Sequence, residues 1–144
     1  MRIEGNYIIC DCGYNMSQLS RYCIYSGIPG FEGFVDLPGT VGGAAINNSG
    51  CFGSLTSNVV ESVIIIKDGE REILTNNQMQ YSHRNSIIKS KRLKAAVLSV
   101  KFKIENKEDS RLLKARAKKK SISTEKIFGN KISESRNNIS CLTT

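Results

Sequence analysis

The chain has 144 residues, 40% of them hydrophobic and 24% charged, a balance typical of a globular protein rather than a disordered one. This length suits one domain with one hydrophobic core. The sequence lacks the ~18 uninterrupted apolar residues of a membrane helix and the layout of a secretory signal. We therefore expect a cytoplasmic protein outside the membrane. The formal net charge of +8 permits an anionic partner but does not establish one.

The cysteines indicate a reducing compartment. Their number is odd and no secretion signal accompanies them, so free thiols are expected rather than a disulfide framework. Cys10 and Cys12 form a C-x-C pair, and His83 is the single histidine. A zinc site requires about four ligands in paired spacings. The sequence supplies no second pair, so no metal site is predicted.

A strand and a helix are expected at the start of the chain. Residues 7–12 predict a short strand. Asn15 can cap a helix over residues 16–25, whose apolar side chains recur at helical spacing. Residues 30–54 then hold more than half of the 12 glycines and cannot form one regular element. Such a loop, ending in small residues that can open a short helix, suits phosphate binding through backbone N–H groups.

Hairpins, not long crossovers, join the later strands. Residues 59–67 and 71–74 predict two strands around an Asp68-Gly69 turn. Leu98, Val100, Phe102 and Ile104 alternate with polar residues, which predicts a half-buried strand with these four side chains on one face. The pattern favours an α+β fold with an antiparallel sheet.

The last third of the chain is polar and basic. Asn106 is expected to cap a helix over residues 107–120, with its cations concentrated near the C-terminal end, where the helix dipole favours them. The run from Lys114 to Lys120 is either a solvated helix end or a surface for nucleic acid or an acidic partner. No aromatic residues are interleaved with it, so nucleic-acid binding is not the favoured interpretation. Residues 121–144 form a Ser- and Asn-rich tail.

Three motifs occur in a fixed order: Glu32-Gly33-Phe34, the run from Leu37 to Ala45, and the run from Asn48 to Gly53. Together they resemble the flavin-binding core of the UDP-N-acetylenolpyruvoylglucosamine reductase (MurB) family, whose members show G-L-E, I-P-G-T-V-G-G-A and N-A-G-A-Y-G at this spacing. The likeness continues through residues 61–69 and 83–87 and covers about residues 13–104.

The resemblance implies part of a vanillyl-alcohol-oxidase-type FAD-binding domain, with an antiparallel sheet flanked by helices. Residues 1–105 are then the second half of that domain, and 106–144 are a basic helix and tail at the start of a substrate domain. The implied activity is an oxidoreductase reaction of peptidoglycan precursor synthesis. It reduces the enolpyruvyl ether of a UDP-sugar to UDP-N-acetylmuramate, with FAD as cofactor and NADPH as hydride donor.

The resemblance also assigns site residues. Those implied to bind the cofactor are Pro38, Gly39, Thr40, Val41, Gly42, Gly43, Asn48, Gly50, Phe52 and Gly53. Those implied to bind substrate are His83, Arg84 and Ser86, and the implied catalytic residues are Arg84 and, on a loose match to the family's proton-donor segment, Cys141. Physically, glycine lets backbone approach a diphosphate closely, and the five donors of an arginine can hold a carboxylate and stabilise charge developing on it.

The sequence departs from the family in several places. His83 replaces a tyrosine, and Phe52 replaces another and lacks its hydroxyl. A Gly-rich G-S-N segment and the C-terminal substrate domain have no counterpart, so we expect a truncated member, to which a second chain could supply the missing parts. The alternatives are a non-catalytic degenerate fragment or binding module of the same fold and, less favoured, a basic nucleic-acid binder.

Overall fold

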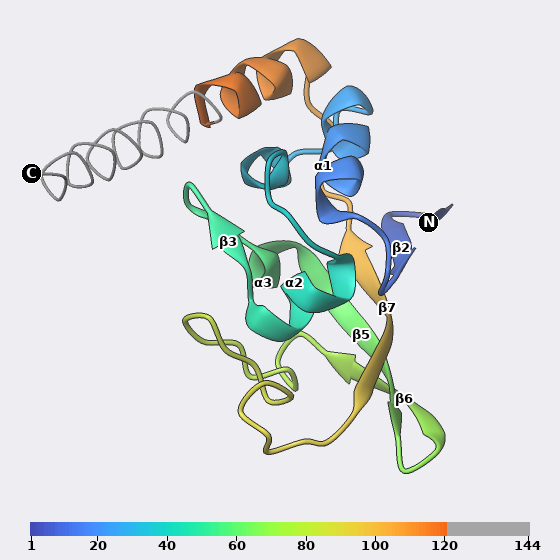
Figure 1. Cartoon of the computed structure of the whole chain (residues 1–144). Helices are drawn as coiled ribbons and strands as arrows, with labels where there is room; N and C mark the ends of the chain where they lie inside the picture. The colour runs from blue at the N-terminus through green and yellow to red at the C-terminus, as the bar shows by residue number, and fades with distance from the viewer. Residues whose placement is uncertain (121–144) are drawn as a thin grey trace, which may run out of the picture.

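The computed structural model describes residues 1–120. Five strands form one sheet in the order β1-β2-β7-β5-β6, and every neighbouring pair is antiparallel (Figure 1). The strands are β1 (Arg2–Glu4), β2 (Tyr7–Asp11), β5 (Val60–Lys67), β6 (Glu70–Thr75) and β7 (Ala96–Lys103). The predicted α+β class with an antiparallel sheet is confirmed. The tail over residues 121–144, and Cys141 with it, lies outside the described residues.

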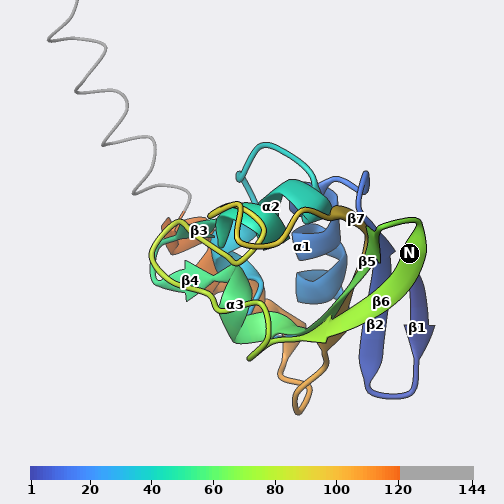
Figure 2. The same ribbon diagram turned by 90° about the horizontal axis from the view of Figure 1, so that it is seen from below.

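The helices gather on one side of the sheet (Figure 2). They are α1 (Met16–Tyr25), the 3-10 turn η1 (Glu32–Phe34), α2 (Val41–Asn47) and α3 (Thr56–Val59), and a small hairpin of β3 (Gly50–Cys51) and β4 (Ser54–Leu55) lies between α2 and α3. Asn15 caps α1 as predicted, because its side chain accepts a hydrogen bond from the Gln18 N–H at 3.0 Å. Within residues 1–120, none of the helices is long and apolar enough to cross a bilayer.

Three phenylalanines lie at the centre of the core. Phe102 on the central strand β7 meets Phe31 edge to face, with ring centroids 5.6 Å apart, and Phe31 meets Phe34 at 6.3 Å. All three side chains are fully buried. Edge-to-face aromatic pairs stabilise a core beyond the area that they bury. The core therefore joins the sheet to the 31–34 segment, which also lines the candidate site.

The predicted placement of Leu98 in the core is wrong. Val100 and Phe102 are fully buried, but Leu98 is 41% exposed. The reason is a shift in register: Ile64 pairs with Ser99, whereas the next residue, Ile65, pairs with Val97. Leu98 is thus the extra residue of a β-bulge, which takes it out of the alternation.

The helix at the end of the described chain begins later than predicted. Residues 110–120 are helical, and residues 107–109 precede the helix. Asp109, rather than Asn106, caps it, since its carboxylate accepts from the Arg111 N–H at 2.8 Å. Upstream, the Glu108 N–H donates to the Gly27 carbonyl at 2.8 Å, which ties this segment to the end of α1. Leu113 and Ala117 then pack on Ile24 of α1.

Replacing Tyr81 with phenylalanine is expected to raise the free energy of unfolding by about 1 kcal/mol. The Tyr81 hydroxyl is buried and has no hydrogen-bond partner within residues 1–120. Removing this hydroxyl from water therefore costs free energy that no hydrogen bond in the folded chain offsets. Urea unfolding of the variant measures the change. Tyr25→Phe is the control, because Tyr25 is 68% exposed and should change little. A loss of stability in Tyr81→Phe would contradict the assignment of an unpaired hydroxyl.

Candidate functional site

The start of α2 is held by the chain's own groups. Thr40 caps the helix and accepts from the Gly43 N–H at 3.2 Å. The Val41 N–H donates to the Tyr14 carbonyl at 2.8 Å, and the Gly42 N–H donates to the Cys12 carbonyl at 2.9 Å. These N–H groups were expected to be available to a diphosphate, but all three already have partners within the protein. Contact of residues 40–43 with a cofactor through other atoms stays a prediction.

Two glycines of the same motif have different roles. A Cβ at Gly42 would lie 2.8 Å from the Cys12 Cβ and 3.1 Å from its carbonyl oxygen, so this glycine is required by close packing against Cys12, the residue after β2. Gly39 has a φ of +115°, and nothing lies within 4 Å of where its Cβ would be. Its open side is therefore where another molecule can approach the backbone closely.

A cavity of about 190 Å³, the Arg84 cavity, brings several predicted residues together. Pro38 borders it from one loop, Gly50 and Phe52 from the β3 hairpin, and Arg84 from the loop before β7. Ala117 and Lys120 of the 110–120 helix also line it. Four of the residues assigned by likeness thus lie around one cavity, although their segments are far apart in sequence. Gly39, the residues of α2 and Ser86 do not line it.

Arg84 lies between this cavity and a neighbouring one of about the same volume. Its φ of +51° is left-handed, and one Nη donates to the Gly50 carbonyl at 3.1 Å. The Arg84 carbonyl accepts from the Lys89 Nζ at 2.7 Å. The side chain is exposed, so its remaining N–H donors can meet a ligand in either cavity.

Ser86 supports the loop that carries Arg84. It is fully buried, and its hydroxyl donates to the Ile46 carbonyl at 2.7 Å and accepts from the Lys89 N–H at 3.2 Å. These bonds tie the loop to α2. In the described structure Ser86 therefore anchors the loop. Its predicted contact with substrate stays a prediction.

Asn48 joins three segments at the end of α2. It adopts a left-handed conformation with φ of +46°, and its amide donates to the Ser82 carbonyl at 2.9 Å and accepts from the Ser57 N–H at 3.0 Å. The neighbouring cavity is lined by Asn48, Gly53, His83 and Arg84 among others. His83 is exposed there. The expected cofactor and substrate contacts of Asn48 and His83 stay predictions.

Sequence reasoning missed the charged contacts that fasten the 110–120 helix. The Glu32 carboxylate is almost buried; it accepts from the Gly30 N–H at 2.7 Å and pairs with Arg116 at 3.4 Å. Arg116 also pairs with Glu108 at 2.8 Å, and the Lys120 Nζ donates to the Ser54 hydroxyl at 3.0 Å. The spacing of Leu113 and Ala117 was the available signal that one helix face is buried.

Comparison with known proteins shows which family this chain belongs to. The chain is 38% identical over 103 residues to the UDP-N-acetylenolpyruvoylglucosamine reductase of Thermosipho melanesiensis, which covers 71% of this chain and 35% of that protein. The match to the same enzyme of Bacillus licheniformis is 35% over 121 residues, 83% of this chain and 40% of that protein. This chain belongs to the UDP-N-acetylenolpyruvoylglucosamine reductase family. It spans about a third to two fifths of the length of these relatives.

The solved structures agree on the fold of the family. The crystal structure of the reductase from Thermus caldophilus superposes with a TM-score of 0.76, covers 86% of this chain and 45% of its own, and shares 18% sequence identity. The expected fold, part of the FAD-binding domain type of the reductase family, is thereby confirmed. No family model matches the chain.

Proposed function

We propose that this chain is part of the FAD-binding region of a reductase that uses NADPH to convert a UDP-N-acetylglucosamine enolpyruvyl ether to UDP-N-acetylmuramate, in the cytoplasm. The observation that carries the proposal is the meeting of Pro38, Gly50, Phe52 and Arg84 around one cavity. These residues come from the motifs that the chain shares with reductases of the family. Membership of that family supports the reaction class, an oxidoreductase of peptidoglycan synthesis.

The residues around the Arg84 cavity fit part of a flavin cofactor. Leu37, Pro38 and Phe52 give an apolar wall beside a cation, and Gly39 leaves its backbone open on the same loop. At about 190 Å³ the cavity is smaller than the ~300–1,000 Å³ of most cofactor sites. It can hold only part of such a molecule, which agrees with a chain that spans part of its relatives. When bound, FAD supplies the hydride-transfer chemistry.

Arg84 would position the substrate in this scheme. Its exposed guanidinium, fixed on one side by the Gly50 carbonyl, presents the other donors to a carboxylate and stabilises the charge that develops there during hydride addition. Ser86 and Lys89 hold the loop in the conformation that aims it. The predicted proton donor, Cys141, lies outside the described residues and stays a prediction.

A non-catalytic flavin-binding module is the second candidate. The chain spans 35% and 40% of the two relatives described above, so parts of their length have no counterpart in it. In this case the chain binds FAD but does not oxidise NADPH, either alone or with a second chain that supplies the missing parts. NADPH oxidation by such a mixture, lost in Arg84→Ala, would instead support the reductase.

An FAD titration tests where the cofactor binds. Gly39→Ala and Gly69→Ala form a matched pair, because both glycines have positive φ and open space where the Cβ would stand, but Gly69 lies in the distant β5–β6 turn. We expect Gly39→Ala to weaken FAD binding about tenfold, equivalent to ~1.4 kcal/mol, and Gly69→Ala to leave it unchanged. Quenching of flavin fluorescence gives the affinities. A folded chain that neither quenches flavin fluorescence nor retains flavin after free FAD is removed would contradict the proposal.

A further inference from the structure

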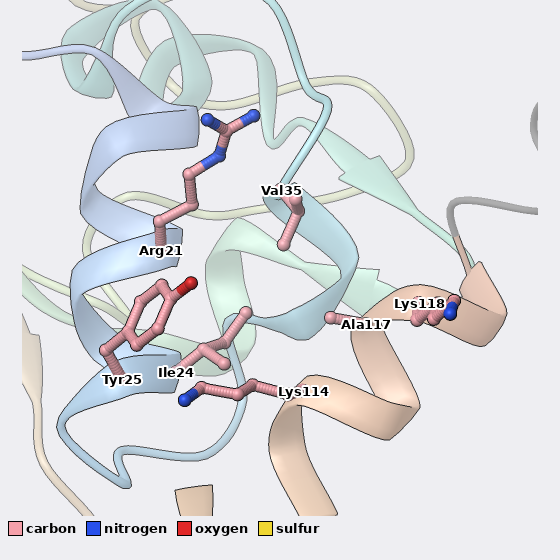
Figure 3. A pocket seen from close by; sticks show the side chains of 7 residues that line it. All are labelled: Arg21, Ile24, Tyr25, Val35, Lys114, Ala117 and Lys118. Atoms are coloured by element: carbon pink, nitrogen blue, oxygen red, sulfur yellow. The ribbon is translucent and has the colours of Figure 1, made fainter. Parts of the chain in front are cut away.

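A second hollow, the α1 pocket, lies between α1 and the 110–120 helix and has a volume of about 340 Å³ (Figure 3). That volume falls in the usual range for small-ligand sites. Ile24, Val35 and Ala117 supply its apolar wall. Val35 and Ala117 also border the Arg84 cavity, so the two hollows share a wall but are lined by different charged residues.

Three cations surround the α1 pocket: Arg21 from α1, and Lys114 and Lys118 one turn apart on the 110–120 helix. No acidic residue is among the seven residues that line it. Within residues 1–120, the side chains of Arg21 and Lys118 make no hydrogen bond or ion pair. Three like charges on the rim of one hollow make the electrostatic potential there positive, and a positive potential attracts an anion.

An aromatic ring completes the pocket. Tyr25 is 68% exposed, and the Lys114 Nζ lies 4.2 Å from its ring centroid. In Figure 3 the Lys114 ammonium lies beside Tyr25 at one end of the hollow, and the Arg21 guanidinium extends from α1 toward the opposite end. The pocket therefore combines an apolar body with a cationic edge.

We propose that the α1 pocket binds a small organic anion, in which a carboxylate, sulfonate or phosphate is joined to a compact apolar or aromatic body. The apolar body contacts Ile24, Val35 and Ala117, and the anionic group accepts hydrogen bonds from Arg21 while the two lysines attract it by their charge. This site is separate from the proposed flavin contacts and goes beyond the proposed reductase function.

The test uses the full chain and 1-anilinonaphthalene-8-sulfonate, an aromatic sulfonate whose fluorescence rises in apolar surroundings. In the double variant Arg21→Gln/Lys114→Gln we expect the Kd of the probe to rise at least tenfold. The control Arg71→Gln/Lys94→Gln removes the same charge from exposed positions away from the pocket and should change the Kd less than about twofold. Added salt should weaken binding to the unmodified chain.

Three results would overturn the proposal: equal weakening in both double variants, no saturable binding, or equally tight binding of the uncharged N-phenyl-1-naphthylamine. Urea unfolding verifies that each variant is folded. If the pocket variant is not, Lys118→Gln takes its place, since the Lys118 side chain makes no hydrogen bond or ion pair within residues 1–120. A several-fold higher Kd is then expected, and an unchanged Kd would count against the site.

Discussion

Replacing Phe102 with alanine is expected to lower the free energy of unfolding by about 3–5 kcal/mol. The ring is fully buried on the central strand and packs edge to face on Phe31, 5.6 Å away, so its loss leaves a cavity where the sheet meets the 31–34 segment. Urea unfolding followed by circular dichroism measures the change. If the variant does not fold, Phe102→Leu should show a smaller loss in the same direction.

Leu98→Ala is the matched control for Phe102→Ala. Leu98 lies on the same strand and was predicted to share the core face with Phe102, but it is the extra residue of the bulge and is 41% exposed. We expect it to cost less than about 1 kcal/mol. Comparable losses in the two variants would show that Leu98 is in the core, and the bulge would then be wrong.

Alkaline pH is expected to destabilise the chain through two core thiols. Cys10 and Cys23 are fully buried. Burial raises the pKa of Cys10 from 9.0 to about 11 and raises that of Cys23 further. The unfolded chain therefore loses these protons at lower pH than the folded chain, so stability is complete below about pH 9 and falls as pH rises toward 11. For Cys10 the loss is about 3 kcal/mol by the time its folded pKa is passed.

The denaturation midpoint in urea, measured between about pH 8 and pH 11, checks this expectation. Cys10→Ala should lower the midpoint at neutral pH but flatten its fall at alkaline pH, because the group that titrates has been removed. The other side chains are the same in both proteins, so the difference between the two curves isolates the thiol. Parallel curves would contradict the account.

Local sequence rules predicted much of the fold because local chemistry dictates it. Asn15 caps α1, and Asp68-Gly69 forms the hairpin turn with positive φ at both residues. The contacts that could not be predicted are long-range. The Leu98 bulge depends on how β7 pairs with β5, and the Glu32–Arg116 contact joins residues 84 positions apart. Neither leaves a periodic signature in sequence.

In the candidate site, too, some features could be predicted from local sequence and others depend on long-range contacts. The motifs identified the loops that meet at the Arg84 cavity, because glycine-rich segments and the Arg84 region are distinctive in sequence. They could not show why each residue is present. Gly42 is packed against Cys12, and Ser86 anchors a loop, so residues within one shared motif serve either folding or a ligand. Only tertiary contacts separate these roles.

An NMR titration of the isotope-labelled chain with FAD tests the central claim most directly. If the motif loops form a flavin site, the backbone amide signals of Gly39, Gly50, Phe52 and Arg84 shift in a saturable way, while that of Gly69 in the β5–β6 turn stays in place. Shifts confined to other parts of the chain, or none at saturating FAD, would contradict a flavin site at the Arg84 cavity.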